Sequence, residues 1–325
     1  MKIAVDAMGG DLGSKIVVEA IKEFVKEYPN DKIIVFGKKE ELEELSSLCR
    51  IEDAPDIVPM EAGALEVIRM NNSSMCKAIT TMKNEQFDAI VSMGSTGGFL
   101  SAATIILKMI PGVKRAALVT AFPTKIKGKK VVVLDVGANN ENSAEELMQF
   151  AHMGKAYCQA LFAIKEPKTY LLSNGAEAHK GSPLVKEAHK LLVENKFEGF
   201  MGNMEARDVL NGEADILVAD GFSGNVLLKG MEGIAKMMSS MIKENFKKNL
   251  WTKLGYLHVR SGFKNMSETM DYKSIGGAML IGINGVVVKA HGNSDAYSFK
   301  NALRVAHQMV EYDVVNKIRE TLLNG

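Results

Sequence analysis

The sequence has few of the features that would assign it to a specialised class of protein. It contains 3 cysteines, 1 tryptophan and 7 prolines in 325 residues. The cysteines are scattered and odd in number, so they indicate neither a disulfide framework nor a zinc site, and they suit a reducing cytoplasm. No apolar run approaches the ~20 residues that a membrane span needs. The chain turns polar after Val5, which argues against a signal peptide.

The charges are nearly balanced. Forty basic residues stand against 39 acidic ones, for a net charge of +1. This balance gives no general attraction to nucleic acid, so any acidic partner must bind a local basic surface. The composition is 46% hydrophobic and 24% charged, which is typical of a globular protein. We expect one catalytic α/β domain over residues 1–325, formed as one body or as two lobes.

Short apolar runs alternate with amphipathic segments from the N-terminus onward. We expect strands at residues 2–5, 32–36 and 56–59, separated by helices, and a long final helix that Ser294 caps and that runs to about residue 322. Such alternation is typical of a sheet covered by helices on both faces. The predicted fold class is therefore α/β, a three-layer α/β/α Rossmann-like fold with a mainly parallel sheet. Ligands of such folds gather at the carboxyl ends of the strands.

The stretch ADILVADGFSGNVLLKG, residues 214–230, contains the clearest candidate binding loop. Its apolar residues 216–218 indicate a buried strand, Gly221 and Gly224 interrupt it, and Asn225 begins a helix-forming segment. Such a loop directs backbone N–H groups and the positive end of a helix dipole at one point, which favours an anion. An ordinary turn without a ligand is the alternative, and the loop alone does not decide between them.

Two other glycine loops occupy the same place after a strand. DAMGGDLGS follows residues 2–5, and MGSTGG follows the strand expected at residues 88–92. Two such units with hydroxyls and glycines favour a shared anion site more strongly than one unit does. The residues that we expect in this site are Asp6, Gly9, Gly10, Asp11, Gly94, Ser95, Thr96 and Gly97.

Polar side chains also follow two other strands. Asp135 and Asn139 come after the β-branched residues 131–134, where they either contact a substrate or brace the loop through bonds to its backbone. Ser143 and Glu146 form a capping box for the next helix. Lys180 lies between glycines in a loop before another helix, which makes it a candidate for holding an anion.

Beyond residue 230, apolar side chains recur at helical spacing beside several lysines. We expect an amphipathic helical protrusion over residues 230–262. Such a stripe suits burial against the core or a dimer partner, and its tryptophan and basic excess also suit an anionic membrane surface. The residues predicted on this surface are Met238, Leu250, Trp251, Leu254 and Leu257.

Taken in order, these motifs resemble the bacterial phosphate acyltransferases that make acyl phosphate from fatty acyl carrier protein for phospholipid synthesis. The resemblance covers essentially the whole chain, although the segment GAEAH before Lys180 is less acidic than the family pattern. The residues that carry it are DAMGGD from Asp6, GSTGG from Gly94, DVGAN from Asp135, Lys180-Gly181, GNMEAR from Gly202, DGFSGN from Asp220, Gly276-Gly277 and His291-Gly292.

The resemblance implies a fold related to phosphotransacetylases and isopropylmalate dehydrogenases, a homodimer, and peripheral association with the inner face of the cell membrane. It implies transfer of a long-chain acyl group from acyl carrier protein to inorganic phosphate, giving acyl phosphate for glycerol-3-phosphate acyltransferase. We expect no metal, no cofactor and no nucleic acid.

Within this reaction we expect Lys180 to position phosphate and Asn225 to donate a hydrogen bond at the reacting centre. The thioester releases a thiol with a reference pKa of about 8.5, so departure needs no strong acid. Asp220 and His291 complete the predicted pocket. Acidic carrier protein would dock on a basic surface that includes Arg69 and Lys264.

Three other functions remain open from the sequence. A phosphotransacetylase would share the fold but take a coenzyme A thioester. A nicotinamide-dependent dehydrogenase would suit the alternating elements, but the sequence has no GxGxxG after a strand with an acidic residue ~20 positions later. A scaffold that binds membrane or carrier protein would use the apolar stripe and leave the glycine loops without a role.

Overall fold

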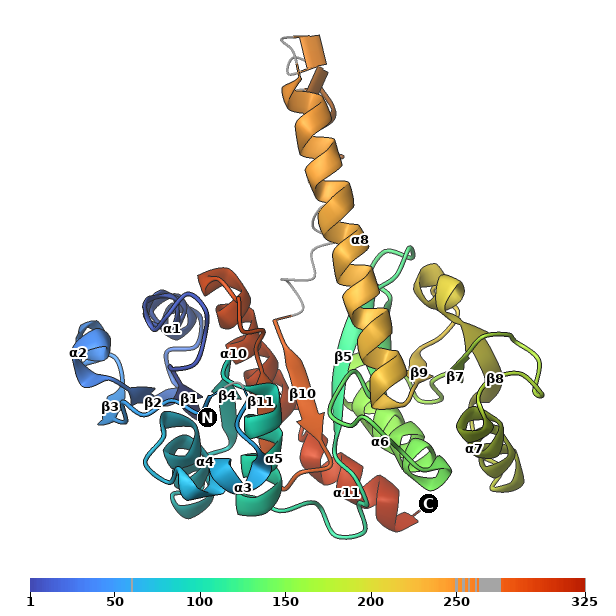
Figure 1. Ribbon diagram of the computed structural model, residues 1–325, viewed down its shortest axis with the longest axis horizontal. Coiled ribbons are helices and arrows are strands. Elements are labelled where there is room, and N and C mark those ends of the chain that lie inside the picture. Colours follow the sequence, from blue (N-terminus) through green and yellow to red (C-terminus); the bar gives the residue numbers. More distant parts are fainter. Residues whose placement is uncertain are drawn as a thin grey trace.

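The computed structural model describes residues 1–59, 61–248, 251–252, 255–256, 258–260, 262 and 276–324. Four residues predicted on the membrane or partner surface, Leu250, Leu254, Leu257 and Lys264, lie outside these ranges. The central feature of the described chain is one sheet of 11 strands, in the order β3-β2-β1-β4-β11-β10-β5-β6-β9-β7-β8 (Figure 1).

The sheet is mainly parallel, as predicted. Each outer half is parallel throughout, and the antiparallel pairs join β11 to β10, β10 to β5 and β5 to β6 in the centre. The strands are β1 (Lys2–Asp6), β2 (Lys32–Gly37), β3 (Arg50–Asp53), β4 (Ala89–Ser92), β5 (Ala117–Pro123), β6 (Lys130–Leu134), β7 (Thr169–Ser173), β8 (Phe200–Glu205), β9 (Ile216–Val218), β10 (Ala278–Ile281) and β11 (Val286–Lys289).

Helices cover both faces of the sheet, which confirms the three-layer architecture. One face packs against α1 (Lys15–Glu27), α6 (Ala144–Phe162), α7 (Pro183–Glu194), α10 (Ala296–Glu311) and α11 (Val314–Asn324). The other face packs against α3 (Ala64–Arg69), α4 (Ser74–Asn84), α5 (Thr96–Ile106), η2 (Ala206–Asn211) and the first turns of α8 (Gly221–Lys247). The short α2 (Lys39–Leu42) and η1 (Glu43–Leu45) precede β3. Apolar side chains of the inner strands are buried in these two layers, whereas the edge strand β3 has no buried residue.

The long helix α8 begins against the sheet and then projects away from the body of the molecule (Figure 1). Its 27 residues correspond to about 40 Å of helix. Leu227, Leu228 and Met231 pack on the core, whereas Met238 on the projecting part is 40% exposed. Trp251, beyond the end of α8, is 82% exposed. Met238 and Trp251, the two residues of the predicted apolar surface that the structure describes, are therefore uncovered in the single chain.

Several element boundaries differ from the prediction. The third strand is β3, because the segment predicted at residues 56–59 makes a single bridge at Asp56. The final helix is two helices, since Asp313 adopts a left-handed φ of 53° between them, and α10 is capped by Asp295 instead of Ser294. Helix α8 begins at Gly221, capped by Asp220. The central strand β5 was not predicted at all.

Candidate functional site

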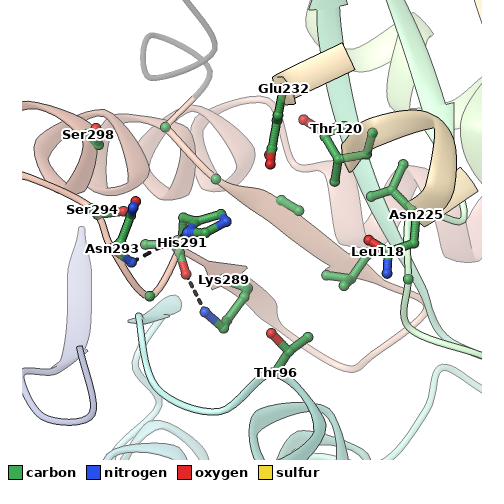
Figure 2. Close-up of a pocket in the computed structure, with 18 of the residues that line it drawn as sticks. Thr96, Leu118, Thr120, Asn225, Glu232, Lys289, His291, Asn293, Ser294 and Ser298 are labelled. Atoms are coloured by element: carbon green, nitrogen blue, oxygen red, sulfur yellow. Dashed lines mark hydrogen bonds between the residues drawn. The ribbon is translucent and has the colours of Figure 1, made fainter. Parts of the chain in front are cut away.

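A cavity of about 470 Å³ lies over the centre of the sheet, at the antiparallel strands that join its two halves. Strands β5, β10 and β11 contribute its lining, together with the base of α8 and the start of α5 (Figure 2). Much of one wall is apolar. The side chains of this wall are Leu118, Phe122, Val136, Leu228 and Ala278.

The buried cation in this cavity is Lys289, the last residue of β11. Its side chain lies between His291 and Thr96 in Figure 2, and the residue is 8% exposed. Its ammonium donates to the Ala290 carbonyl. Burial lowers the pKa of Lys289 to about 8, while the nearby Asp6 opposes that shift. Sequence reasoning missed this residue, although a lysine directly after three valines of a buried strand is an unusual pattern that marks it.

The mouth of the cavity carries a second polar cluster, which joins α8 to the segment after β11. The Lys229 ammonium lies 2.9 Å from a Glu232 carboxylate oxygen and 3.1 Å from Nε2 of His291. Burial, and then the charge of Lys229, lowers the pKa of His291. These contacts make the base of α8 one wall of the cavity.

Asn225 projects from α8 into the cavity, near Thr120 of β5 (Figure 2). Among the described residues, neither the Asn225 amide nor the Thr120 hydroxyl has a hydrogen-bond partner in the chain. Thr120 is buried and Asn225 is an exposed residue of the cavity lining, so both groups are available to a bound molecule. The role of Asn225 as a donor to a reacting group stays a prediction.

The loops after β1 and β4 pack directly against each other at the edge of the cavity. A side chain at Gly9, which has φ of +81°, would approach the Gly94 backbone to 2.9 Å. The buried carboxylate of Asp6 accepts hydrogen bonds from Ser92 at 2.7 Å and from the Met8 N–H at 3.2 Å. Burial raises its pKa. Asp6 therefore holds the two loops together, and Asp11, Gly94 and Thr96 line the cavity itself.

The remaining predicted residues of these loops have local structural contacts. Ser95 caps α5 by accepting from the Gly98 N–H at 3.2 Å. A side chain at Gly10 would meet the end of the Met93 side chain at 2.4 Å, so Met93 would have to shift to admit it. Gly97 has open space around its Cα atom.

The loop after β6 shows how Asp135 acts. Its buried carboxylate accepts from the backbone N–H groups of Leu118, Gly137, Ala138 and Asn139, and from the Asn139 amide, at 2.8–3.0 Å. Burial raises its pKa against these five donors. The sequence allows Asp135 either to contact a substrate or to brace the loop through bonds to its backbone. These hydrogen bonds favour bracing of the loop.

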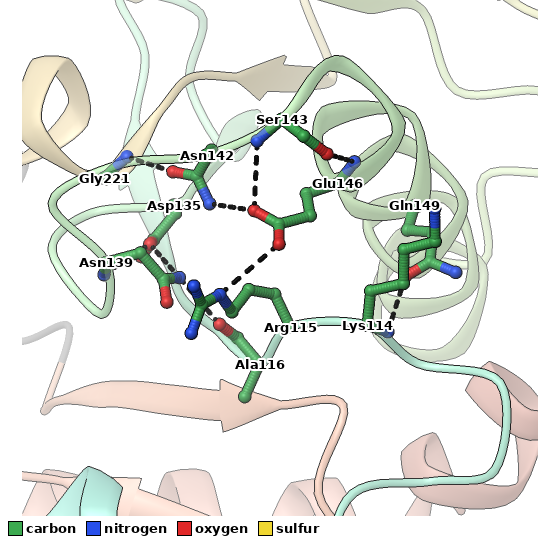
Figure 3. Close-up of polar contacts among 10 residues, drawn as sticks. All are labelled: Lys114, Arg115, Ala116, Asp135, Asn139, Asn142, Ser143, Glu146, Gln149 and Gly221. Atoms are coloured by element: carbon green, nitrogen blue, oxygen red, sulfur yellow. Dashed lines mark hydrogen bonds and ion pairs between the residues drawn. The ribbon is translucent and has the colours of Figure 1, made fainter.

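The first turn of α8 packs on that same loop. A side chain at Gly224 would come within 1.9 Å of the Asp135 carbonyl, and one at Gly221 within 2.0 Å of the Asn139 carbonyl. The Gly221 N–H donates to Asn142, which also donates to Glu146 (Figure 3). The Ser223 N–H donates to the capping carboxylate of Asp220. The glycines thus allow close packing, and these N–H groups already have partners within the chain.

The capping box predicted at Ser143 and Glu146 is confirmed, and Glu146 also pairs with Arg115 at 3.3 Å. Lys180 lies on the exposed loop between β7 and α7, outside the residues that line the cavity. The structure therefore brings together Asp11, Gly94, Thr96, Asn225 and His291 of the predicted site, but it leaves Lys180 apart from them.

Two kinds of feature are absent from the described ranges. In that part of the chain, no group of three or more histidine, cysteine or acidic residues is arranged to hold a metal ion. No helix described by the structure combines the length and the apolar character needed to cross a membrane.

The chain resembles known proteins in both sequence and fold. A family model described as "Fatty acid synthesis protein" matches residues 1–317. A phosphate acyltransferase of Exiguobacterium sp. is 42% identical over 98% of both chains. A branched-chain phosphotransacylase of Enterococcus faecalis aligns over 95% of this chain and 99% of its own, with a TM-score of 0.62 and 16% identity.

A phosphotransacetylase of Streptococcus pyogenes has the same fold, with a TM-score of 0.57 and 18% identity over 100% of this chain and 94% of its own. At this identity the likeness concerns the fold alone, and it agrees with the predicted relation to phosphotransacetylases. The sequence matches extend over nearly the whole length of the chain and of its relatives. The chain therefore belongs to the phosphate acyltransferase family of fatty acid synthesis proteins.

Proposed function

We propose that this protein transfers a long-chain fatty acyl group from acyl carrier protein to inorganic phosphate. The observation that carries the proposal is the central cavity, which combines an apolar wall with a buried ammonium and, among the described residues, hydrogen-bond donors without partners. The apolar wall suits the acyl chain. The polar side suits phosphate and the oxyanion that forms on the thioester carbonyl.

The reaction requires little from the protein beyond binding and orientation. A phosphate oxygen attacks the carbonyl carbon, the bond from that carbon to sulfur breaks, and the thiolate leaves and takes up a proton from water. Phosphate is already an anion near neutral pH, so holding it beside the carbonyl supplies much of the rate. Asn225 lines the cavity, and in this proposal it donates to the carbonyl oxygen as negative charge develops there.

The role of Lys180 in positioning phosphate stays a prediction. Its loop is held by Gly181, whose N–H donates to Asn174 at 2.9 Å, and by Asn203, which donates to the Glu177 carbonyl. The exposed ammonium has to reach the cavity from this loop during the reaction. Loss of turnover in a folded Lys180→Ala variant would support that role.

Acyl carrier protein is the proposed donor because an acidic carrier would find an exposed basic residue at Arg69. Charges at the edge of a docking interface chiefly raise the association rate, and their effect is screened by salt. We expect the KM for acyl carrier protein to rise between low and high salt. A KM that is independent of salt would contradict electrostatic docking.

We also propose a homodimer and peripheral attachment to an anionic membrane on the cytoplasmic side. The exposed Met238 and Trp251 support an interface of one of these two kinds. The product, acyl phosphate, would then form near the membrane where an acyltransferase that uses glycerol 3-phosphate consumes it.

The decisive experiment measures thiol release from a long-chain acyl carrier protein, with and without inorganic phosphate, in a buffer containing a metal chelator. Phosphate-dependent release with an acyl product that hydroxylamine traps is the expected result. Release from a coenzyme A thioester alone would show a phosphotransacetylase instead. Absence of release from both would contradict the acyltransferase proposal.

A further inference from the structure

The cavity contains a buried lysine to which the sequence analysis assigned no role. Lys289 is more than nine-tenths buried, and charged side chains are rarely buried to that degree without a partner. Within the described ranges its ammonium has no carboxylate at ion-pair distance and donates to one acceptor, the Ala290 carbonyl. An ammonium has three N–H donors, so the remaining donors are available on the cavity side.

The acidic residues near Lys289 form no ion pair with it in the part of the chain that the structure describes. Asp6 is already engaged by Ser92 and the Met8 N–H, and it lies behind the lining. Asp11 is exposed at the edge of the cavity. The other groups that face Lys289 are Lys229, which pairs with Glu232, and His291, whose Nε2 lies 3.1 Å from the Lys229 ammonium. The Lys289 ammonium therefore has no ion pair among the described residues, although the charges of Asp6 and Asp11 favour its charged form at longer range.

The start of α5 lies on the same side of the cavity. Thr96, its first residue, is a lining residue and lies beside Lys289 in Figure 2. The helix is 11 residues long, so the positive end of its dipole is directed at the space next to the ammonium. A buried ammonium and a helix N-terminus at one point favour a small anion with several oxygen atoms.

We propose that Lys289 binds the phosphate that accepts the acyl group, holding it between the end of β11 and the first turn of α5. This inference rests on the proposed function and adds Lys289 as a residue that binds the second substrate, beside the predicted positioning role of Lys180. Two ligands could present a tetrahedral phosphate group to Lys289. One is inorganic phosphate, and the other is the phosphodiester on the pantetheine arm of the acyl donor. The inference assigns Lys289 to inorganic phosphate.

The test compares Lys289→Met, which removes the charge and keeps a similar volume, with Lys289→Arg, which keeps the charge. Lys155→Met is the matched control, because Lys155 lies on α6 away from the cavity, with a side chain that is 15% exposed and pairs with Glu198. Equilibrium dialysis with radiolabelled inorganic phosphate measures binding without any turnover. Thermal melting shows whether each variant is folded.

Lys289→Met is expected to raise the Kd for phosphate by about 10- to 100-fold, the usual effect of losing a charged hydrogen bond. Lys289→Arg should restore most of the affinity, and Lys155→Met should bind like the unchanged protein. In steady-state assays, the KM for phosphate should rise while the KM for the acyl thioester stays within about threefold. A folded Lys289→Met protein with unchanged phosphate affinity overturns the inference. A raised KM for the thioester alone assigns Lys289 to the donor arm and also overturns it.

The pH dependence of phosphate affinity gives a second test, which does not require the Lys289→Met protein to fold. Since Lys289 has a pKa of about 8, its charge is lost as pH rises through that value, whereas arginine stays charged. Asp6, Asp11, Lys229 and His291 are unchanged in the Lys289→Arg protein. Phosphate affinity should therefore fall above pH 8 in the unchanged protein and stay nearly level in Lys289→Arg. Identical pH profiles contradict the inference.

Failure of the proposed function gives a different result. Phosphate binding that depends on Lys289, in a protein that transfers no acyl group, would contradict the acyltransferase proposal and leave the binding site intact.

Discussion

The two ends of α8 differ in what surrounds them. At the base, Gly221 and Gly224 lie so close to the loop after β6 that no other residue fits. On the projecting part, a methyl group added at Gly230 or Gly233 would meet no described atom within 4 Å beyond its own stretch of helix, and Ile234 is 57% exposed. The same residue type is therefore required by packing at one end and replaceable at the other. The base belongs to the cavity, and the projecting half is a separate surface.

Gly224→Ala should have the largest effect on stability. The new methyl group would overlap the Asp135 carbonyl at 1.9 Å, and two rigid backbones have little room to separate. We expect the free energy of unfolding to fall by about 3 kcal/mol or more, measured by urea denaturation. A fully stable Gly224→Ala protein would show that the base of α8 is not held against the loop.

Asp135→Asn tests the brace from the other side of that contact. Asparagine replaces one acceptor oxygen with a donor, which then faces the loop's own N–H groups. We expect a loss of about 2 kcal/mol of unfolding free energy. Asp208→Asn, on η2 away from the loop, is the control and should change stability little. Equal losses in both proteins would refute the brace.

Asn225→Ala should separate activity from stability at the base of α8. Losing a donor to a developing oxyanion lowers kcat by about 10²- to 10³-fold. Because the amide has no partner in the described chain, melting should be unchanged. Val226→Ala, on the adjacent exposed position, is the control and should keep normal kcat. A folded Asn225→Ala protein with normal kcat would remove Asn225 from the mechanism.

The double change Met238→Ser and Met241→Ser addresses the projecting half. Both side chains are at least 40% exposed, and burying one in lipid contributes about 1 kcal/mol. We expect binding to anionic vesicles to fall about 10-fold or more, with thiol release in solution unchanged. Met201→Ser on β8 is the control. Unchanged vesicle binding with a loss of dimer in sedimentation would identify this surface as the dimer face.

Gly233→Ala should have the smallest effect and the opposite sign to Gly224→Ala. Alanine is favoured over glycine in a helix by about 1 kcal/mol, and this position has free space. A small rise in melting temperature is expected. A loss as large as that of Gly224→Ala would show that the projecting half is packed against another part of the protein.

The sequence predicted the local elements well where periodicity and caps agreed. Strands β1, β2 and β9 and the capping box at Ser143 all follow from short-range patterns. It missed β5, whose sequence ALVTAFP is mostly apolar, ends at Pro123 and gives no clear alternation. That strand is identified as central only by its two antiparallel partners, β6, which follows it in the sequence, and β10, which comes from a distant part of the chain.

The residues of the site can also be separated into those that the sequence predicted and those that only the structure revealed. The sequence by itself determined which loops follow strands, and therefore that Asp11, Gly94, Asn225 and His291 lie at strand or helix ends. Only the tertiary structure decided which of these loops face a common cavity. It showed Asp135 and the α8 glycines to be packing contacts, and it brought Lys289 into the cavity. Burial and the partner of each polar group depend on segments far apart in the chain, and no local pattern contains that information.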